Sequence, residues 1–177
     1  MHFTIGDYVL DIAQNAVEAG AGEVVVELDE TESGFRVAVV DDGRGMTAEE
    51  KERALDPYYT DGTKHAKRKV GLGIPFLAQA VEQAGGRWSI DSEKGRGTRV
   101  DFEFPASSVD SPPPGDLPSL LLALLCLPGG HEMLIRRSGP RGEYELSRRE
   151  LADAVGGLER ASSLAALKDY LVSQEED

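Results

Sequence analysis

Several features that mark specialised classes of protein are scarce in the sequence or missing from it. Cysteine occurs once, at Cys126, which excludes an internal disulfide and suits the reducing cytoplasm. No apolar run approaches the ~20 residues that a membrane-spanning helix needs, and the longest, residues 120–127, has the length of a core helix. The N-terminus lacks the basic start and apolar stretch of a secretion signal. We therefore expect a cytoplasmic protein without membrane association, in which Cys126 is a small buried hydrophobe.

Positive charge is scarce as well. The chain has 19 Lys and Arg residues against 32 Asp and Glu residues, and its formal net charge of −13 opposes a general attraction to nucleic acid or anionic membranes. A hydrophobic share of 40% and a charged share of 29% are typical of a soluble globular protein. The exception to the acidic character is a short basic cluster formed by Lys64, Lys67, Arg68 and Lys69.

The hydrophobic pattern predicts alternating helices and strands over residues 1–105. Apolar residues recur at helical spacing in some segments and form strand-like runs in others. The predicted helices span 7–19, a short segment from about Thr47, and 74–84, and the predicted strands span 23–28, 35–40, 87–91 and 99–104. Residues 57–70 have no clear period, and a loop of this length inside a compact domain is often functional.

The composition changes after residue 105. Residues 106–116 are rich in Ser, Pro and Gly and have no apolar pattern, which is typical of a linker. Beyond this linker we predict a helix over 117–127, strands around 133–137 and 144–146, and helices from about Ser147 and Ser163. The chain is therefore predicted to contain a domain over 1–105 and a small C-terminal α+β module over 117–177, with a regulatory or docking role.

The segment DIAQNAVEAGA, residues 11–21, is the first of four that can carry chemistry. Asp11, Asn15 and Glu18 are four and three residues apart, so they project from one helix face. A solvated surface helix has the same spacing. Asparagine is nevertheless a mediocre helix former that is favoured where its side chain makes a specific hydrogen bond.

The other three segments are rich in glycine. In DDGRGM, Gly43 and Gly45 let the backbone turn and approach a ligand closely, after an aspartate, Asp41, that can accept a hydrogen bond from an amino group. An ordinary turn after a strand has the same pattern. In KVGLGIPF, two glycines precede a helix whose N-terminus can hold an anion, and the basic cluster can add contacts to phosphate. KGRGTRVDFEF is by itself a hairpin turn followed by Thr98.

The order and spacing of these four segments resemble the GHKL superfamily, which includes DNA gyrase B subunits, heat-shock chaperone ATPases, histidine kinases and MutL-type mismatch-repair proteins. The resemblance covers about residues 7–105. It implies the Bergerat ATP-binding fold, an α/β sandwich in which helices lie on one face of a mixed, mostly antiparallel sheet. It also implies ATP and Mg²⁺ as cofactors.

The resemblance assigns roles to individual residues. Asn15 matches the asparagine that ligates Mg²⁺, for which an amide oxygen is a suitable ligand. Asp11 stands where ATPase members have a glutamate that activates water, and its side chain is one methylene shorter. Asp41 matches the aspartate that binds the adenine amino group, and Thr98 the threonine that supports it. The full set of predicted nucleotide contacts is Asn15, Glu18, Asp41, Gly43, Gly45, Met46, Tyr59, Lys64, Lys69, Gly71, Leu72, Gly73 and Thr98.

The loop over 56–70 corresponds in this comparison to the ATP lid, and DPYYTDGTKHAKRKVGLGI is most like the histidine-kinase pattern. Pro57, Tyr58 and Tyr59 are candidates for its aromatic hinge. The basic cluster contains the candidates for phosphate contacts, and the sequence does not single out one of its members.

The location of the histidines separates this sequence from a complete histidine kinase, which carries a phosphoacceptor histidine on a dimerising hairpin ahead of its ATP domain. Here the ATP helix begins almost at Met1, and His2, His65 and His131 fall at the terminus, in the lid and before a strand. We therefore expect no autophosphorylation on histidine in cis. Three hypotheses remain: a protein kinase acting in trans, as anti-sigma-factor kinases do; an ATPase that uses Asp11; and a non-hydrolysing, ATP-dependent interaction switch. Each implies a protein partner or substrate, and the apolar pattern of 117–177 also allows a homodimer.

Overall fold

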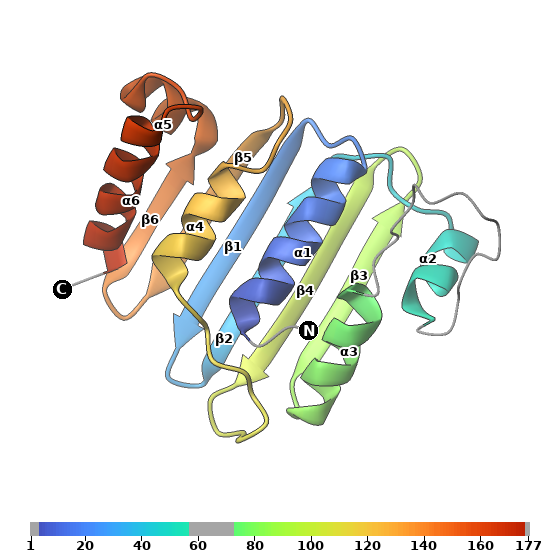
Figure 1. Ribbon diagram of the computed structural model, residues 1–177. Coiled ribbons are helices and arrows are strands. Elements are labelled where there is room, and N and C mark those ends of the chain that lie inside the picture. Colours follow the sequence, from blue (N-terminus) through green and yellow to red (C-terminus); the bar gives the residue numbers. More distant parts are fainter. Residues whose placement is uncertain (1–3, 57–72, 176–177) are drawn as a thin grey trace.

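The computed structural model describes residues 4–56 and 73–175, which form one six-stranded sheet with helices over one of its faces (Figure 1). The strand order is β3-β4-β2-β1-β5-β6. The helices are α1 (Ile5–Glu18), α2 (Ala48–Leu55), α3 (Gly73–Gln83), α4 (Leu117–Leu125), α5 (Arg148–Val155) and α6 (Ala161–Glu175). The strands are β1 (Glu23–Thr31), β2 (Gly34–Asp41), β3 (Arg87–Glu93), β4 (Gly97–Pro105), β5 (Glu132–Gly139) and β6 (Gly142–Ser147).

The pairing of the strands confirms the predicted mixed, mostly antiparallel sheet. Of the described strand pairs, only β1 and β5 are parallel. Alternation along β2 places Phe35, Val37 and Val39 in the core under the helices. Charged side chains line the other face, where Arg99 and Arg136 both contact Glu27. A face of this kind is solvated, which explains why the helices lie on one side only.

The central helix, α1, has a well-defined start. Thr4 accepts a hydrogen bond from the backbone of Asp7, and the Asp7 carboxylate accepts one from the backbone of Thr4, which together form a capping box. The next two backbone amides, of Ile5 and Gly6, donate to the carbonyl oxygens of Pro113 and Pro114. The predicted linker therefore lies against the N-terminus of α1 and completes its capping.

The C-terminal part of the chain shares the sheet and the core with the rest. β5 pairs with β1 and β6 pairs with β5, so residues 132–147 extend the same sheet. Met133 and Ile135 of β5 are fully buried, as are Leu124 and Leu125 of α4, within the core cluster that also contains residues of α1. The residues before and after 106–116 therefore form one sheet and one core, whereas the sequence pattern alone predicted a small α+β module over 117–177 beyond a linker.

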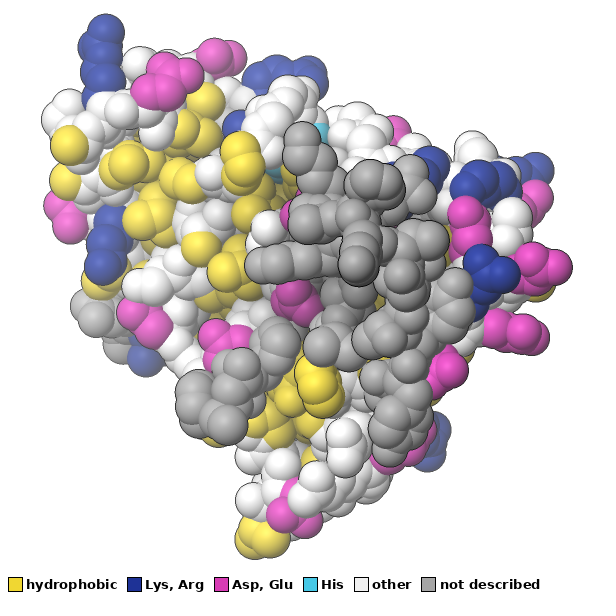
Figure 2. Space-filling model, turned by 45° about the vertical axis from the view of Figure 1, so that its right-hand side comes forward, with side chains coloured by type: hydrophobic (Ala, Val, Ile, Leu, Met, Phe, Trp, Pro, Cys, Tyr) yellow, Lys and Arg dark blue, Asp and Glu magenta, His cyan; other side chains and the backbone are white. Residues whose placement is uncertain are grey.

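The helices of this C-terminal part leave hydrophobic side chains at the surface. Figure 2 shows such side chains, in yellow, gathered in the upper left of the view, where the C-terminal helices lie. None of the residues of α5 is buried, and Leu122 of α4 and Leu164 of α6 are half-buried. The prediction that Cys126 is buried is wrong: α4 ends at Leu125, and Cys126 is an exposed C-cap residue beyond the last buried turn. Among the helices that the structure describes, none is long and apolar enough to cross a membrane.

Candidate functional site

The inward face of the sheet changes from apolar to polar at one end of three neighbouring strands. Val39 of β2 lies opposite Val100 of β4, and both are buried. Two residues further along, Asp41 lies opposite Thr98, and Thr98 lies opposite Ser92 of β3. Because side chains two residues apart share a face, three polar side chains stand side by side where the apolar rows end.

Asp41 is a buried carboxylate with a definite environment. The residue is 9% exposed, and its Oδ1 accepts a hydrogen bond of 2.8 Å from the amide of Gly43. Burial raises the pKa of Asp41, the backbone amides of Gly43 and Thr98 act in the opposite direction, and the neighbouring charge of Asp42 adds to the increase. The group is therefore a hydrogen-bond acceptor that water solvates poorly, which suits it to a ligand that brings a donor.

Glycine lets the segment that follows Asp41 fit between α1 and the β3–β4 hairpin. A Cβ atom at Gly43 would lie 2.8 Å from Oδ1 of Asp41 and 3.1 Å from Cβ of Ala19 at the end of α1. At Gly45, whose φ is +60°, a Cβ atom would lie 1.9 Å from the carbonyl oxygen of Glu93. Any larger residue would push this segment away from Asp41, so the space beside the carboxylate depends on both glycines.

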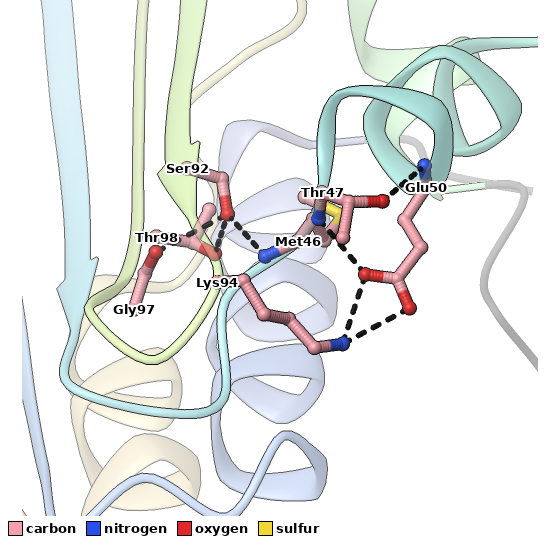
Figure 3. Close-up of polar contacts among 7 residues, drawn as sticks. All are labelled: Met46, Thr47, Glu50, Ser92, Lys94, Gly97 and Thr98. Carbon is pink, nitrogen blue, oxygen red and sulfur yellow. Dashed lines mark hydrogen bonds and ion pairs between the residues drawn. The ribbon is translucent and has the colours of Figure 1, made fainter.

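Ser92 links the three strands to this segment (Figure 3). Its Oγ accepts a hydrogen bond of 2.9 Å from the amide of Met46 and lies 2.8 Å from Oγ1 of Thr98 and 3.1 Å from the carbonyl oxygen of Gly97. No motif in the sequence points to Ser92. Only the register of β3 against β4 places it beside Thr98, and a serine in a strand carries no signal of that register.

Helix α2 is fixed to the same hairpin through its N-terminus. Thr47 and Glu50 form a capping box, and Nζ of Lys94 lies 3.0 and 2.9 Å from the two carboxylate oxygens of Glu50 (Figure 3). The Thr47 amide and Lys94 lower the pKa of Glu50. Because the ion pair is exposed to solvent, its contribution to stability is small. The ion pair instead orients α2, the helix that precedes residue 57, against the β3–β4 hairpin.

The polar face of α1 contributes the remaining described candidates. Asp11 lies at the first residue of α3, where a Cβ atom added to Gly73 would lie 1.7 Å from Oδ2 of Asp11. Asn15 is half-buried, and its side chain makes no hydrogen bond with any residue that the structure describes. Glu18 is exposed and accepts a hydrogen bond of 3.1 Å from Gln14 of the same helix. On this face of α1, the amide group of Asn15 is not used by any described residue, whereas the Glu18 carboxylate is hydrogen-bonded to Gln14 along the helix surface.

Asp42, to which no motif assigns a role, joins the site to the C-terminal part of the chain. Its Oδ1 accepts hydrogen bonds of 2.7 and 2.9 Å from the amides of Gly22 and Glu23 at the start of β1. The carbonyl oxygen of Gly22 in turn accepts one of 2.8 Å from the amide of Glu132 at the start of β5. The position of the residue beside Asp41 is therefore coupled to β5 through two hydrogen-bonded steps.

Several of the predicted site residues lie outside the described residues. They are Tyr59, Lys64, Lys69, Gly71 and Leu72, together with the candidates Pro57, Tyr58, Lys67 and Arg68. The structure brings together Asp41, Gly43, Gly45, Met46 and Thr98 on one side and Asp11 with Gly73 on another. Within residues 4–56 and 73–175 it has no group of three or more His, Cys, Asp or Glu side chains placed to hold a metal ion.

Comparisons with known proteins point to one family. Residues 4–108 match the model of the family described as histidine kinase-, DNA gyrase B- and HSP90-like ATPases. The sensor histidine kinase ZraS of Klebsiella oxytoca is 34% identical over 105 residues, which is 56% of this chain and 21% of that protein. The cell-division control histidine kinase PdhS of Brucella canis is 33% identical over 119 residues, 60% of this chain and 12% of its own length. The chain thus spans about a fifth or less of these relatives.

Solved structures of histidine kinases are also similar. The nucleotide-free catalytic domain of the histidine kinase ThkA matches with a TM-score of 0.42 and 23% identity, over 56% of this chain and 64% of that one. Full-length ShkA in complex with AMPPNP matches with a TM-score of 0.44 and 23% identity, over 58% of this chain and 22% of that one.

Proposed function

Because the chain belongs to the family of histidine kinase-, DNA gyrase B- and HSP90-like ATPases, we propose that it binds ATP with magnesium at the site around Asp41. The observation that carries the proposal is the buried Asp41 carboxylate beside Thr98, on a floor that Gly43 and Gly45 keep open. The amino group of adenine donates hydrogen bonds. An acceptor that is poorly solvated and bordered by glycine backbone fits that group.

The polar face of α1 fits the phosphate end of the nucleotide. Asn15 has a half-buried amide group that no described residue uses, and an amide oxygen suits Mg²⁺. When bound, the ion would neutralise charge on the phosphates. Asp11, one turn earlier on the same face, is the carboxylate that can take a proton from an attacking water or hydroxyl group. Gly73, three residues after the end of the predicted lid, leaves the space in which that carboxylate lies.

For the reaction of the bound ATP, we favour transfer of phosphate to a protein outside this chain, or hydrolysis, within bacterial signalling or regulation. The sensor and cell-division kinases among the relatives support a signalling role, and a cytoplasmic location stays a prediction. The alternative is a switch that binds ATP without turnover. The proximity of the Asp11 carboxylate to Gly73, the first residue of α3, is compatible with this alternative, since a carboxylate beside a helix N-terminus can respond to a shift of that helix.

Replacing Asn15 with Ala tests the magnesium end of the pocket. We expect the affinity for ATP in the presence of Mg²⁺ to fall at least about tenfold, because the loss of a ligand oxygen removes about one hydrogen-bond equivalent or more. Affinity measured in EDTA should change little. Gln83→Ala, which removes an exposed side-chain amide at the end of α3, is the matched control in calorimetric titrations. Equal Mg²⁺-dependent affinities in wild type and Asn15→Ala would remove Asn15 from the site.

Replacing Asp11 with Asn separates turnover from binding. If Asp11 acts as a general base, phosphate release or transfer should fall about a hundredfold, while ATP affinity stays within a few-fold. Asp91→Asn, an exposed carboxamide substitution on β3, is the control. Phosphate release and transfer of labelled γ-phosphate to proteins encoded nearby would be measured together. Turnover by Asp11→Asn at the wild-type rate would exclude Asp11 as the base, and binding with no turnover in either protein would favour the switch.

A further inference from the structure

The hydroxyl group of Ser92 has three polar neighbours, and together they restrict how its hydrogen and its lone pairs can be oriented. A serine hydroxyl has one hydrogen to donate and two lone pairs. Around Ser92 Oγ, the amide of Met46 can only donate, the carbonyl oxygen of Gly97 can only accept, and the hydroxyl of Thr98 can do either. All three lie within 3.1 Å.

Only one assignment makes all three contacts hydrogen bonds. The Met46 amide occupies one lone pair of Ser92, so the single Ser92 hydrogen must point to the carbonyl oxygen of Gly97. The second lone pair of Ser92 then accepts the hydrogen of Thr98. In the reverse assignment, with Ser92 donating to Thr98, the carbonyl oxygen of Gly97 loses its contact with Ser92 (Figure 3).

This assignment decides whether the Thr98 hydroxyl can donate a hydrogen bond to a ligand or can only accept one. Its hydrogen is used on Ser92, and Thr98 Oγ1 has no other partner among the described residues. Thr98 therefore offers lone pairs only. Asp41, its pair partner on β2, also offers lone pairs. Two acceptors side by side fit an exocyclic amino group and repel an exocyclic carbonyl oxygen.

We infer that Ser92 is a positioning residue that fixes Thr98 as a hydrogen-bond acceptor and so makes the pocket select a base with an amino group over one with a carbonyl group at the same place. The inference rests on the proposed ATP site. Its physical basis is that a rotating hydroxyl adapts to either ligand, whereas a hydroxyl whose hydrogen is already committed does not.

The test uses ATP and ITP, which differ in this exocyclic group, an amino group in ATP and a carbonyl oxygen in ITP, and at ring N1, an acceptor in ATP and an N–H donor in ITP. Because the two bases are the same in every titration, the change of the affinity ratio between variants is the readout, not the ratio of the wild type alone. Ser92→Ala removes the acceptor of the Thr98 hydrogen, so Thr98 becomes free to donate to the ITP carbonyl oxygen. We expect the ratio of ATP to ITP affinities to fall by about tenfold, one hydrogen bond's worth, mainly because ITP binds better. Asp41 is kept in every variant, so ATP still binds.

Three variants separate positioning from a merely structural effect. Ser89→Ala makes the same change on the same strand at an exposed position and should leave the ratio at the wild-type value. Ser92→Thr retains the hydroxyl on a β-branched side chain, so its ratio of ATP to ITP affinities should equal that of the wild type. In a Thr98→Val background Ser92→Ala should have no further effect on the ratio, because Ser92 acts through Thr98. If Ser92→Ala does not fold, Ser92→Cys, a weak donor and acceptor of similar size, takes its place.

The outcomes are distinct. A lower ratio in Ser92→Ala, with rescue by Ser92→Thr, supports the inference. An equal loss of affinity for both nucleotides, leaving the ratio unchanged, would overturn it and assign Ser92 a packing role only. A wild-type protein that binds ATP and ITP equally well would overturn it while the ATP site stands. A wild-type protein that binds neither would remove the proposed function and this inference with it.

Discussion

Asp41→Asn should bind ATP about a thousandfold more weakly than wild type and yet be at least as stable. A hydrogen bond to a charged group contributes about 1.5–3 kcal/mol, and a buried donor left facing a donor costs a further 1–3 kcal/mol or so. The amide nitrogen of the substituted side chain would face the amino group of adenine in this way. Its amide oxygen could still accept from the backbone of Gly43, as Oδ1 of Asp41 does, so the turn after β2 should persist.

The stability of Asp41→Asn follows from the direction of the pKa shift. Burial raises the pKa of Asp41 above its ordinary value of 3.8. A raised folded-state pKa means that the folded protein holds this proton more tightly than the unfolded chain, so the contribution to stability is present in acid and is lost as the pH rises through the folded pKa. At neutral pH the ionised Asp41 therefore destabilises the fold. Asparagine carries no charge and removes that cost.

Two measurements check this prediction. Calorimetric titration with ATP gives the affinity, and thermal unfolding at pH 7 and in acid gives the stability. We expect a Tm equal to or above that of wild type at pH 7, with the difference shrinking as the pH falls below the unfolded pKa. Asp91→Asn, an exposed change on β3, should alter neither quantity. ATP affinity within tenfold of wild type would exclude Asp41 as the base-binding group, and a clearly lower Tm would contradict the stated effect of burial.

The candidate site residues that the sequence predicts are those that a motif fixes by local spacing. Asp41, Gly43 and Gly45 follow one another on a single turn, and Asn15 and Asp11 lie on one helix face, so neither set needs knowledge of the distant fold. Helical and strand periodicity likewise predicted each described element of the sheet layer, with ends displaced by a few residues. These features depend on contacts close in sequence, where periodicity and turn chemistry are informative.

What the sequence could not supply are contacts that depend on register and on strand order. Ser92 meets Met46 across 46 positions of sequence, and nothing in the pattern of β3 specifies that meeting. The parallel pairing of β5 with β1 likewise depends on a crossover from one end of the chain to the other. A Ser- and Pro-rich segment is typical of a linker, yet the carbonyl oxygens of Pro113 and Pro114 cap α1. Composition alone does not distinguish a segment that separates two units from one that packs between them.

The close approach of β4 to the end of β2 gives the second large expected effect, on stability. Gly97 begins β4 with a φ of +99°, and a Cβ atom there would lie 1.9 Å from the carbonyl oxygen of Asp41. Gly95, in the same hairpin with a φ of +82°, has nothing within 4 Å of its Cβ position. The two glycines share the backbone strain that an L-residue would meet, and they differ in the collision.

Gly95→Ala should therefore cost only the left-handed conformation, about 1–2 kcal/mol. Gly97→Ala carries that cost and must also move a backbone carbonyl group, so we expect a loss of at least about 4 kcal/mol, in the range reserved for severe core changes. Because the atom that must move belongs to Asp41, ATP affinity should fall with stability in Gly97→Ala and hold in Gly95→Ala. Urea unfolding and ATP titration of both variants would measure this. Equal losses of stability in the two variants would mean that β2 and β4 do not approach as closely at Gly97 as this distance implies.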